Sequence, residues 1–534
     1  MGHPDQIRRI VRTDPDRPCV VEGERHLSFG EVNDRADRAA EAWLGAGLAA
    51  GDRVAVLAHN ELEYLEWQIA AQRAGLILVP LNVRLSVSEL RDIVGDAGPS
   101  LLVHGPGFAD QAEALRVGQT LHLGDRGVGE SYEAALAAAE PRPRAITDPA
   151  ALASLLYTSG TTGSAKGAMI SNRALLARSL ALAVDLSLGR DDVFLQTLPM
   201  FHLAQTFSCA FATLGATNVL LRTFDPTAAL EAIARHGVTH TLVVPTILQA
   251  LIAHPDLADV DRSTLRAVFY GASPISETQL ARALEAFAGC DFYQMYGMTE
   301  TGPATLLRPH QHDLSRPEVL RSAGSEIVTF ELDIIDANGS PCPDGTAGEI
   351  VVTGPALLDG YWRAPEHTRA ALRRGLMHTG DIGFRGPDGS LRVTDRLKDI
   401  IITGGENVAP IRVEHVLTTH PAIAECAVVP VPHPHWGEQV HAVLVLRDPA
   451  SPPSTQELDA LCRTRLGGYE LPRSWSVRDT LPRTATGKVR RHLLRHDLGA
   501  PLDQQTDDTD HPAIDEPNRP AAAGTATTEG ATRG

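Results

Sequence analysis

The chain has 534 residues, of which 43% are hydrophobic and 21% charged, and its formal net charge is −18. This length suggests several domains or one large domain with a small one, and the composition is that of a soluble globular protein. The acidic balance argues against general binding to nucleic acids or anionic membranes. No segment approaches the ~20 apolar residues that span a bilayer, and the N-terminus lacks the apolar core of a signal peptide. We therefore expect a cytoplasmic protein with no membrane span.

The N-terminal part alternates predicted strands and helices. Ser28 and Glu31 have the spacing of a capping box that opens a helix, and Gly47 is its expected stop. The next segments predict a strand, a helix and a strand at 51–58, 61–75 and 76–82, and the rhythm recurs near 213–251 and 265–297. Such alternation predicts α/β layers with largely parallel strands.

The pattern of predicted strands and helices changes near Thr394. A turn-rich hairpin is expected over 386–396, and a compact α+β unit of strands and two helices follows it. The segment 501–534 lacks apolar periodicity and large apolar side chains, which predicts disorder. The expected organisation is a large N-terminal multi-sheet α/β domain (1–395), a small C-terminal α+β domain (396–500) and a disordered acidic tail (501–534).

The strongest local signal is a glycine- and hydroxyl-rich loop that follows an apolar strand within 155–171. Its glycines let the backbone approach an anion and form a nest of N–H donors, and its hydroxyls and lysine add donors and positive charge. The sequence is not a Walker loop, because Gly167 rather than Ser or Thr follows the lysine. A phosphate-binding loop is therefore predicted from Thr158, Ser159, Gly160, Thr161, Thr162, Gly163 and Lys166.

This loop, YTSGTTGSAKG, resembles the phosphate loop of the adenylate-forming enzymes, which include fatty-acid and 4-coumarate CoA ligases, peptide-synthetase adenylation domains and firefly luciferase. Six more motifs follow in the family's order and extend the resemblance to about residues 20–495: PMFHL, GASP, YGMTETGP, TGD, DRLKDIIITGGENVAP and PRTATGKVRR. The resemblance implies the fold of this family, with a mobile C-terminal domain. It also implies an AMP-forming ligase that uses ATP, Mg²⁺ and coenzyme A.

The resemblance assigns nucleotide-binding roles to several residues. Thr299 would contact the α-phosphate, and Glu300 would hold Mg²⁺, a hard cation that prefers oxygen ligands. Tyr296 would stack on adenine, and Asp381 would accept hydrogen bonds from the ribose hydroxyls. The other residues implied at the nucleotide are Gly271, Ala272, Ser273, Gln294, Met295, Gly297, Val393 and Arg396.

The C-terminal domain of the family serves two half-reactions by rotating. Lys488 matches the catalytic lysine, whose ammonium offsets the repulsion between the anionic carboxylate and the α-phosphate. Lys398 matches the hinge, where large dihedral changes are absorbed. Gly404 and Gly405 match the loop beside which the pantetheine arm of coenzyme A enters.

The acid-binding pocket is the least defined part of the prediction. His202 matches a residue at its mouth, and the remaining wall is implied by the alignment of motifs: Gln205, Phe207, Val244, Tyr270, Gly302 and Pro303, together with Met295. This mostly apolar lining suits an aromatic or medium-length aliphatic acid. The segment 324–336 departs from the family pattern, since it lacks the usual glycine and prolines of a nearby turn.

Three functions remain open at this point. The first is an acyl- or aryl-CoA ligase, which the GGENVAP segment favours. The second is an adenylating enzyme that passes the acyl group to another acceptor, such as a carrier protein or an amine. The third is a non-catalytic ligand-binding relative, which the presence of Lys488, Glu300, Asp381 and Arg396 disfavours. Monomer and homodimer are both open.

Overall fold

The computed structural model describes residues 2–144, 148–158, 165–273, 275, 277–396, 399–403, 406–434, 436–483 and 489–498. The predicted disorder of 501–534 falls outside these residues. None of the described helices is long and apolar enough to cross a membrane.

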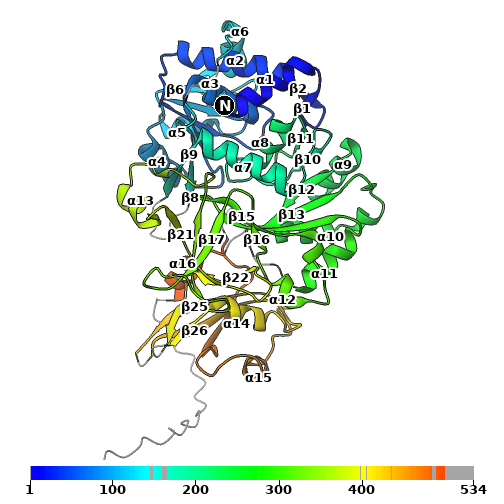
Figure 1. Ribbon diagram of the computed structural model, residues 1–534, viewed down its shortest axis with the longest axis vertical. Coiled ribbons are helices and arrows are strands. Elements are labelled where there is room, and N and C mark those ends of the chain that lie inside the picture. Colours follow the sequence, from blue (N-terminus) through cyan, green and yellow to red (C-terminus); the bar gives the residue numbers. More distant parts are fainter. Residues whose placement is uncertain are drawn as a thin grey trace, which may run out of the picture.

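A nine-stranded sheet forms one half of the large N-terminal part (Figure 1). Its six inner strands are parallel, and an antiparallel strand or hairpin closes each edge. Inner strands such as HTLV and AVFYG are buried on both faces, as parallel strands covered by helices must be. In spatial order the strands are β16 (Ser325–Glu326), β15 (Gly302–Leu307), β14 (Asp291–Met298), β13 (Ala267–Gly271), β12 (His240–Val243), β10 (Val193–Gln196), β11 (Thr217–Leu220), β1 (Pro18–Glu22) and β2 (Arg25–Ser28).

An eight-stranded sheet forms the other half. Its inner strands are again parallel, and β9 and β19 add an antiparallel edge beside the predicted phosphate loop. In spatial order the strands are β19 (Gly360–Tyr361), β9 (Lys166–Ser171), β8 (Leu152–Thr158), β4 (Ile77–Pro80), β3 (Arg53–Leu57), β5 (Leu101–His104), β6 (Gln119–His122) and β7 (Glu130–Ser131).

Helices follow the strands as the alternation predicts. The capping box of α2 is confirmed, since the Glu31 N–H donates to the Ser28 hydroxyl at 3.2 Å and the Ser28 N–H donates to the Glu31 carboxylate at 2.7 Å. The helix ends at Gly45, two residues before the predicted stop. The helices are α1 (His3–Thr13), α2 (Phe29–Gly45), α3 (Glu63–Ala74), α4 (Val87–Ala97), α5 (Ala109–Leu115), α6 (Tyr132–Ala138), α7 (Asn172–Asp185), α8 (Gln205–Leu214), α9 (Pro226–His236), α10 (Pro245–Ile252) and α11 (Glu277–Ala286).

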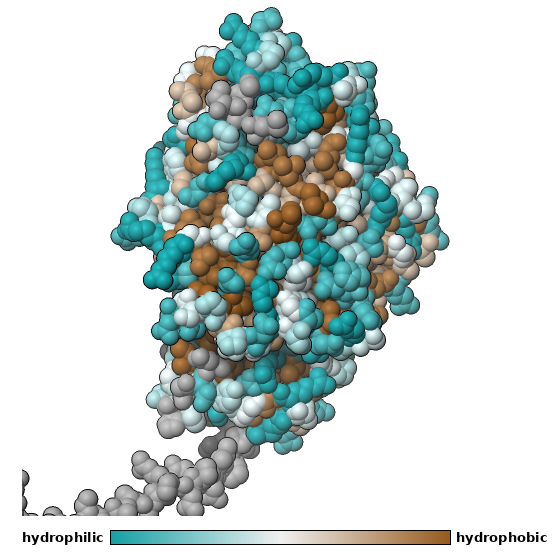
Figure 2. Space-filling model, in the orientation of Figure 1, coloured by the Kyte–Doolittle hydropathy of each residue, from teal (hydrophilic) through white to brown (hydrophobic). Residues whose placement is uncertain are grey.

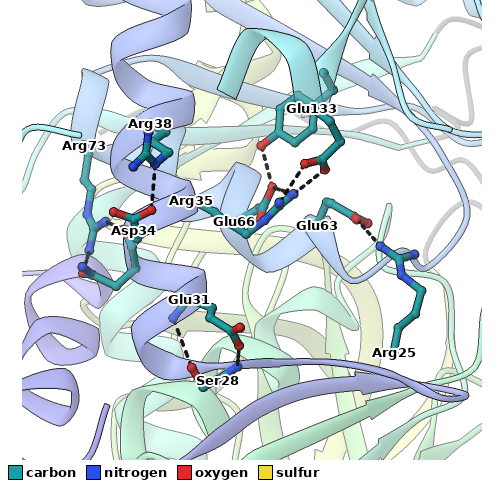
Figure 3. A network of polar contacts seen from close by, with 12 residues as sticks. Arg25, Ser28, Glu31, Asp34, Arg35, Arg38, Glu63, Glu66, Arg73 and Glu133 are labelled. Carbon is teal, nitrogen blue, oxygen red and sulfur yellow. Dashed lines mark hydrogen bonds and ion pairs between the residues drawn. The ribbon is translucent and has the colours of Figure 1, made fainter. Parts of the chain in front are cut away.

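Every residue of α3 is buried although the helix is rich in polar side chains. Figure 3 shows how charges on α2 compensate this burial: Arg35 donates to both Glu66 on α3 and Glu133 on α6. The Tyr132 hydroxyl adds a bond to Glu66 at 2.6 Å. A buried carboxylate with such partners ties three helices together.

A third, antiparallel sheet follows, made of β17 (Glu331–Ile335), β18 (Gly348–Thr353), β20 (Leu372–Arg373), β21 (Leu376–Arg385) and β22 (Leu391–Arg396), with α12 (Pro317–Leu320) and α13 (Pro365–Ala371) nearby in the chain. The predicted hairpin before residue 397 is the β21–β22 pair. Figure 1 shows the chain after residue 400, in yellow and orange, gathered at one end of the molecule. Its elements are β23 (Ile401–Thr403), β24 (Glu406–Val408), α14 (Pro410–Leu417), β25 (Ile423–His433), β26 (Gly437–Leu446), α15 (Thr455–Arg463), β27 (Ser474–Val477) and α16 (Arg491–Leu498).

Helix α8 carries two apolar faces. Cys209 and Ala212 pack into the cluster that contains α3, whereas Phe207 and Phe211 pack into the cluster that contains Met295. The neighbouring α7 leaves Leu180 44% and Val184 64% exposed, and Figure 2 shows apolar residues gathered over that region of the surface.

The sheets and the helices that alternate with their strands confirm the predicted α/β class.

Candidate active site

Much of the predicted site lies outside the described residues. This applies to the phosphate-loop residues Ser159, Gly160, Thr161, Thr162 and Gly163, to the hinge residue Lys398, to Gly404 and Gly405, and to Lys488. The site can therefore be built from the strands that flank these segments.

The turn between β14 and β15 carries Thr299 and Glu300. A Cβ atom on Gly297 would lie 2.0 Å from the Gly302 carbonyl oxygen, and Gly302 has a φ of +73°. Glycine at both positions lets the two strands approach more closely than any side chain would permit. The Thr301 hydroxyl accepts from the Met298 N–H at 3.1 Å and closes the turn.

Glu300 is held by two segments far from it in the sequence. Its side chain is 6% exposed, and its Oε1 accepts from the Tyr361 hydroxyl at 2.7 Å. Its backbone carbonyl accepts from the Leu358 N–H at 2.8 Å and from the guanidinium of the buried Arg178 at 2.9 Å. Burial lowers the pKa of Arg178 to about 10, so the side chain stays a cation at neutral pH.

The predicted phosphate-loop lysine reaches the same place. The Lys166 ammonium lies 6.0 Å from the centre of the Tyr361 ring. Strand β9, which begins at Lys166, pairs with β19, which ends at Tyr361. The fold therefore brings the proposed phosphate-binding and metal-binding residues to one corner.

Two of the predicted nucleoside residues, Tyr296 on β14 and Asp381 on β21, contact each other. The Tyr296 hydroxyl donates to Asp381 Oδ2 at 2.8 Å, and Asp381 is 5% exposed. The Asp381 N–H donates to the Thr379 hydroxyl at 3.1 Å. In the β21–β22 hairpin the backbone of Asp381 pairs with that of Arg396. The aromatic ring predicted at adenine and the carboxylate predicted at ribose are thus directly linked.

The backbone of the GASP motif is shaped by close contact with β14. A Cβ atom on Gly271 would lie 2.4 Å from the Met295 carbonyl oxygen, so only glycine fits there. The next residue, Ala272, has a φ of +67°, which is uncommon for alanine and is typical of functional turns. Tyr296 and Val393 pack against one apolar cluster, which agrees with an adenine wall made by both.

His202 lies in the turn that leads into α8, with its ring 4.7 Å from that of Phe201. Its Nε2 is buried and has no hydrogen-bond partner among the described residues. Burial, with a smaller contribution from the Arg84 cation, lowers the pKa of His202 to about 4. At neutral pH this side chain is an uncharged donor or acceptor rather than a cation.

The structure separates two predicted pocket residues from the rest. Gln205 lies on the α3 face of α8 and donates to Gln68, whereas Phe207 faces the cluster with Met295. Two residues apart on a helix point in nearly opposite directions, which explains the difference. Gln205 and Phe207 therefore face different parts of the structure, and their shared place in the acid pocket stays a prediction.

Tyr270 also points away from Phe207. Its ring packs in the cluster beneath α10 and α11, and its hydroxyl contacts His312 Nε2 at 3.0 Å. Gln294, directly opposite on β14, accepts weakly from the same hydroxyl at 3.4 Å. Alternation along β13 leaves Phe269, not Tyr270, on the face of Phe207. Of the other predicted wall residues, Val244 caps α10, while Gly302 and Pro303 begin β15.

Sequence reasoning missed several residues that shape the site. Tyr361 and Arg178 hold Glu300, and Asn60 holds the loop that precedes His202. None belongs to a motif quoted above, and their partners lie 61 to 140 residues away. Only the pairing of strands and helices in three dimensions reveals them.

The C-terminal unit faces the large domain close to this site. The Arg490 cation, two residues after Lys488, contributes to a lowered pKa of Glu89 on α4, behind the hydrogen bonds from Ser86. Helix α14 also lies beside β22.

Comparison with known proteins now adds to the geometry. Residues 7–362 match the family model of AMP-binding enzymes, and residues 412–488 match that of the AMP-binding enzyme C-terminal domain. The chain belongs to the AMP-binding enzymes. The predicted membership of the adenylate-forming superfamily is confirmed, and this AMP-binding enzyme falls in the class that includes AMP-forming CoA ligases.

Relatives of this AMP-binding enzyme align over nearly their whole length. A feruloyl-CoA synthase from Amycolatopsis sp is 39% identical over 496 residues, which is 92% of this chain and 98% of the relative. An indoleacetate–CoA ligase from Aromatoleum aromaticum is 36% identical over 92% of this chain and 96% of its own. The fatty acid–[acyl-carrier-protein] ligase ScoC from Streptomyces coeruleorubidus is 34% identical over 92% and 97%.

Solved structures agree with the fold of this AMP-binding enzyme. The amide bond synthetase McbA from Marinactinospora thermotolerans superposes with a TM-score of 0.84 at 32% identity, covering 93% of this chain and 99% of McbA. The o-succinylbenzoate CoA synthetase MenE from Bacillus subtilis, solved with its acyl-adenylate intermediate, superposes with a TM-score of 0.82 at 30% identity, covering 93% and 98%. The predicted adenylate-forming fold is confirmed.

Proposed function

We propose that this enzyme uses ATP to convert a carboxylic acid to its acyl-adenylate, with release of pyrophosphate, and then transfers the acyl group to coenzyme A. The observation that carries the proposal is that β14 and the turn after it take part in both groups of contacts. Glu300 accepts from Tyr361, whose ring lies beside Lys166, and Tyr296 donates to Asp381. A phosphate corner and a nucleoside corner so arranged suit one bound adenosine triphosphate.

The carboxylate of Glu300 fits a Mg²⁺ ion that arrives with the nucleotide. Magnesium is commonly held by one or two carboxylates, with phosphate oxygens and water completing its shell. Among the described residues no three His, Cys, Asp or Glu side chains form a metal-binding group, so Glu300 would share the ion with the phosphates. Bound there, Mg²⁺ would neutralise phosphate charge during attack by the acid.

The chain's own residues would provide the remaining charge stabilisation. Thr299 would donate to the α-phosphate, Lys166 would pair with the outer phosphates, and Lys488 would deliver its ammonium to the reacting centre. Lys398 would act as the hinge that exchanges Lys488 for Gly404 and Gly405 in the second half-reaction. His202, neutral at physiological pH, would orient the acid through a hydrogen bond rather than an ion pair.

The acid is proposed to be aromatic or medium-chain aliphatic. Phe207, Phe269 and Met295 face one another in an apolar cluster, which favours flat apolar acids. The feruloyl-CoA synthase and indoleacetate–CoA ligase relatives activate aryl acids by name, which supports the same class.

A different acceptor is the second candidate. One relative is named as an acyl-carrier-protein ligase and one structural neighbour as an amide bond synthetase, so this family also serves carrier proteins and amines. Such an enzyme would keep the adenylation step and change only the nucleophile.

The test is pyrophosphate exchange over a panel of aryl, fatty and amino acids at saturating ATP and Mg²⁺, followed by analysis for a CoA thioester. Exchange with an aryl or medium-chain acid, followed by thioester formation, is the expected result. Exchange without any thioester would move the proposal to another acceptor. No exchange with any acid would overturn the catalytic proposal itself.

A further inference from the structure

The strap formed by residues 358–362 connects the two halves of the phosphate corner. At one end the Leu358 N–H donates to the Glu300 carbonyl at 2.8 Å. At the other end the Trp362 N–H donates to the Gly167 carbonyl at 2.8 Å, next to Lys166. Tyr361 lies between these anchors, so its position is fixed relative to both the carboxylate and the start of β9.

The hydroxyl of Tyr361 donates a hydrogen bond to Oε1 of Glu300. The 2.7 Å bond takes one lone pair of Oε1 of Glu300 and restrains the plane of the carboxylate. The carboxylate is therefore held in one orientation, with Oε2 and the second lone pair of Oε1 left for a cation.

We propose that Tyr361 is a positioning residue that orients Glu300 toward the Mg²⁺ ion accompanying ATP. The inference rests on the proposed function, in which Glu300 is the metal-binding carboxylate. Carboxylates that ligate metals are themselves hydrogen-bonded, and the loss of such an outer partner typically costs 10–100-fold in metal affinity or activity. The aromatic ring of Tyr361 has a separate contact with the Lys166 ammonium, at the outer limit of a cation–π interaction.

Tyr361→Phe separates these two roles, because it removes the hydroxyl and keeps the ring beside Lys166. The primary measurement is Mn²⁺ binding in the presence of a non-hydrolysable ATP analogue, followed by the loss of the free Mn²⁺ electron paramagnetic resonance signal. The dissociation constant for Mn²⁺ should rise about 10–100-fold. The Mg²⁺ concentration for half-maximal pyrophosphate exchange should rise by a similar factor.

The matched control is Tyr132→Phe. Tyr132 also donates its hydroxyl to a buried carboxylate, Glu66, at 2.6 Å, and it lies on α6, outside the predicted site. This bond is separate from Glu300, so Mn²⁺ affinity should stay within about twofold of wild type. Binding of AMP without metal should be unchanged in both variants, which shows that each is folded.

A double-mutant cycle with Glu300→Gln tests whether Tyr361 acts on the metal ion through Glu300. Once the carboxylate is gone, adding Tyr361→Phe should have little further effect on Mn²⁺ affinity, since the hydroxyl acts through Glu300. Wild-type Mn²⁺ affinity in a Tyr361→Phe protein that binds AMP normally would overturn the inference and leave the proposed function standing. A wild-type enzyme without acid-dependent exchange, but with Tyr361-dependent Mn²⁺ binding, would overturn the proposed function alone.

Discussion

Replacing Asn60 by alanine should loosen the loop that carries His202. Asn60 is 3% exposed and lies between β3 and α3. Its Nδ2 donates to the carbonyls of Leu198 at 3.1 Å and Leu221 at 3.0 Å, and its Oδ1 accepts from the Met200 N–H at 2.8 Å. The Asn60 side chain thus links the segments that follow β10 and β11 to the loop between β3 and α3 of the eight-stranded sheet.

The expected loss of stability follows from the hydrogen bonds that each partner of Asn60 would lose. The Leu198 carbonyl keeps a second donor, Gln196 Nε2 at 2.6 Å, so its loss is small. The Met200 N–H and the Leu221 carbonyl would each lose their side-chain partner, at about 1–3 kcal/mol apiece. The free energy of unfolding should therefore fall by about 2–6 kcal/mol, a large part of the 5–15 kcal/mol typical of a domain.

The assay is urea denaturation followed by tryptophan fluorescence, with Asn218→Ala as the matched control. Asn218 is 1% exposed on β11, but neither atom of its amide has a hydrogen-bond partner among the described residues. Its replacement should change stability by less than about 1 kcal/mol, because no bond is lost. Asn60→Ala should also raise the KM of the acid more than that of ATP. Equal losses in the two variants would refute the reasoning.

The structure makes three more predictions. Tyr296→Phe should raise the KM of ATP about tenfold and leave the KM of the acid unchanged. The reason is that the variant loses the hydrogen bond to Asp381, and a hydrogen bond to a charged group contributes about 1.5–3 kcal/mol. An unchanged KM of ATP would contradict this role of the contact. Gly297→Ala should prevent accumulation of folded protein, since its Cβ would lie 2.0 Å from a carbonyl oxygen, whereas Gly95→Ala in α4, where a Cβ meets no atom within 4 Å, should be expressed normally. The free energy of unfolding should fall as the pH drops from about 6.5 to 4.5. Burial lowers the pKa of five histidines to about 4, so the unfolded chain binds more protons than the folded chain in this range; they are His3, His202, His240, His312 and His441. Glu61 and Glu66, each with a pKa of about 7, act in the opposite direction. The net proton uptake on unfolding can be read from denaturation midpoints against pH, and a flat profile would exclude it.

The elements that the sequence predicts well are those with local causes. The capping box of α2, the strand–helix–strand alternation and the β21–β22 hairpin each follow from residues a few positions apart. The pocket wall is different, because it depends on which face of an element meets another. The helical period does separate Gln205 from Phe207, and the strand period separates Phe269 from Tyr270, so these two assignments were within reach of the sequence.

The contacts of Glu300 could not be predicted from the sequence. Tyr361 approaches it only because β19 pairs with β9, and Arg178 only because α7 packs behind the β14–β15 turn. A sequence pattern gives no spacing for such a meeting. The same holds for Asn60, whose partners Leu198 and Leu221 follow β10 and β11 of the other large sheet.

The division of contacts between the two parts of the chain has a consequence for the two half-reactions. Glu300 is bonded to Tyr361 and Tyr296 to Asp381, and all four residues come before residue 397, so these two pairs form a frame within the large N-terminal part. Substitutions in this frame should impair adenylation and also any later step that needs bound adenylate. Lys488 and the glycines at 404 and 405 follow the predicted hinge at 398, so a change there should affect one half-reaction and spare the other. Separate assays of pyrophosphate exchange and of thioester formation from supplied acyl-adenylate distinguish the two patterns. A Lys488→Ala protein impaired equally in both assays would contradict a frame that serves two orientations of the C-terminal unit.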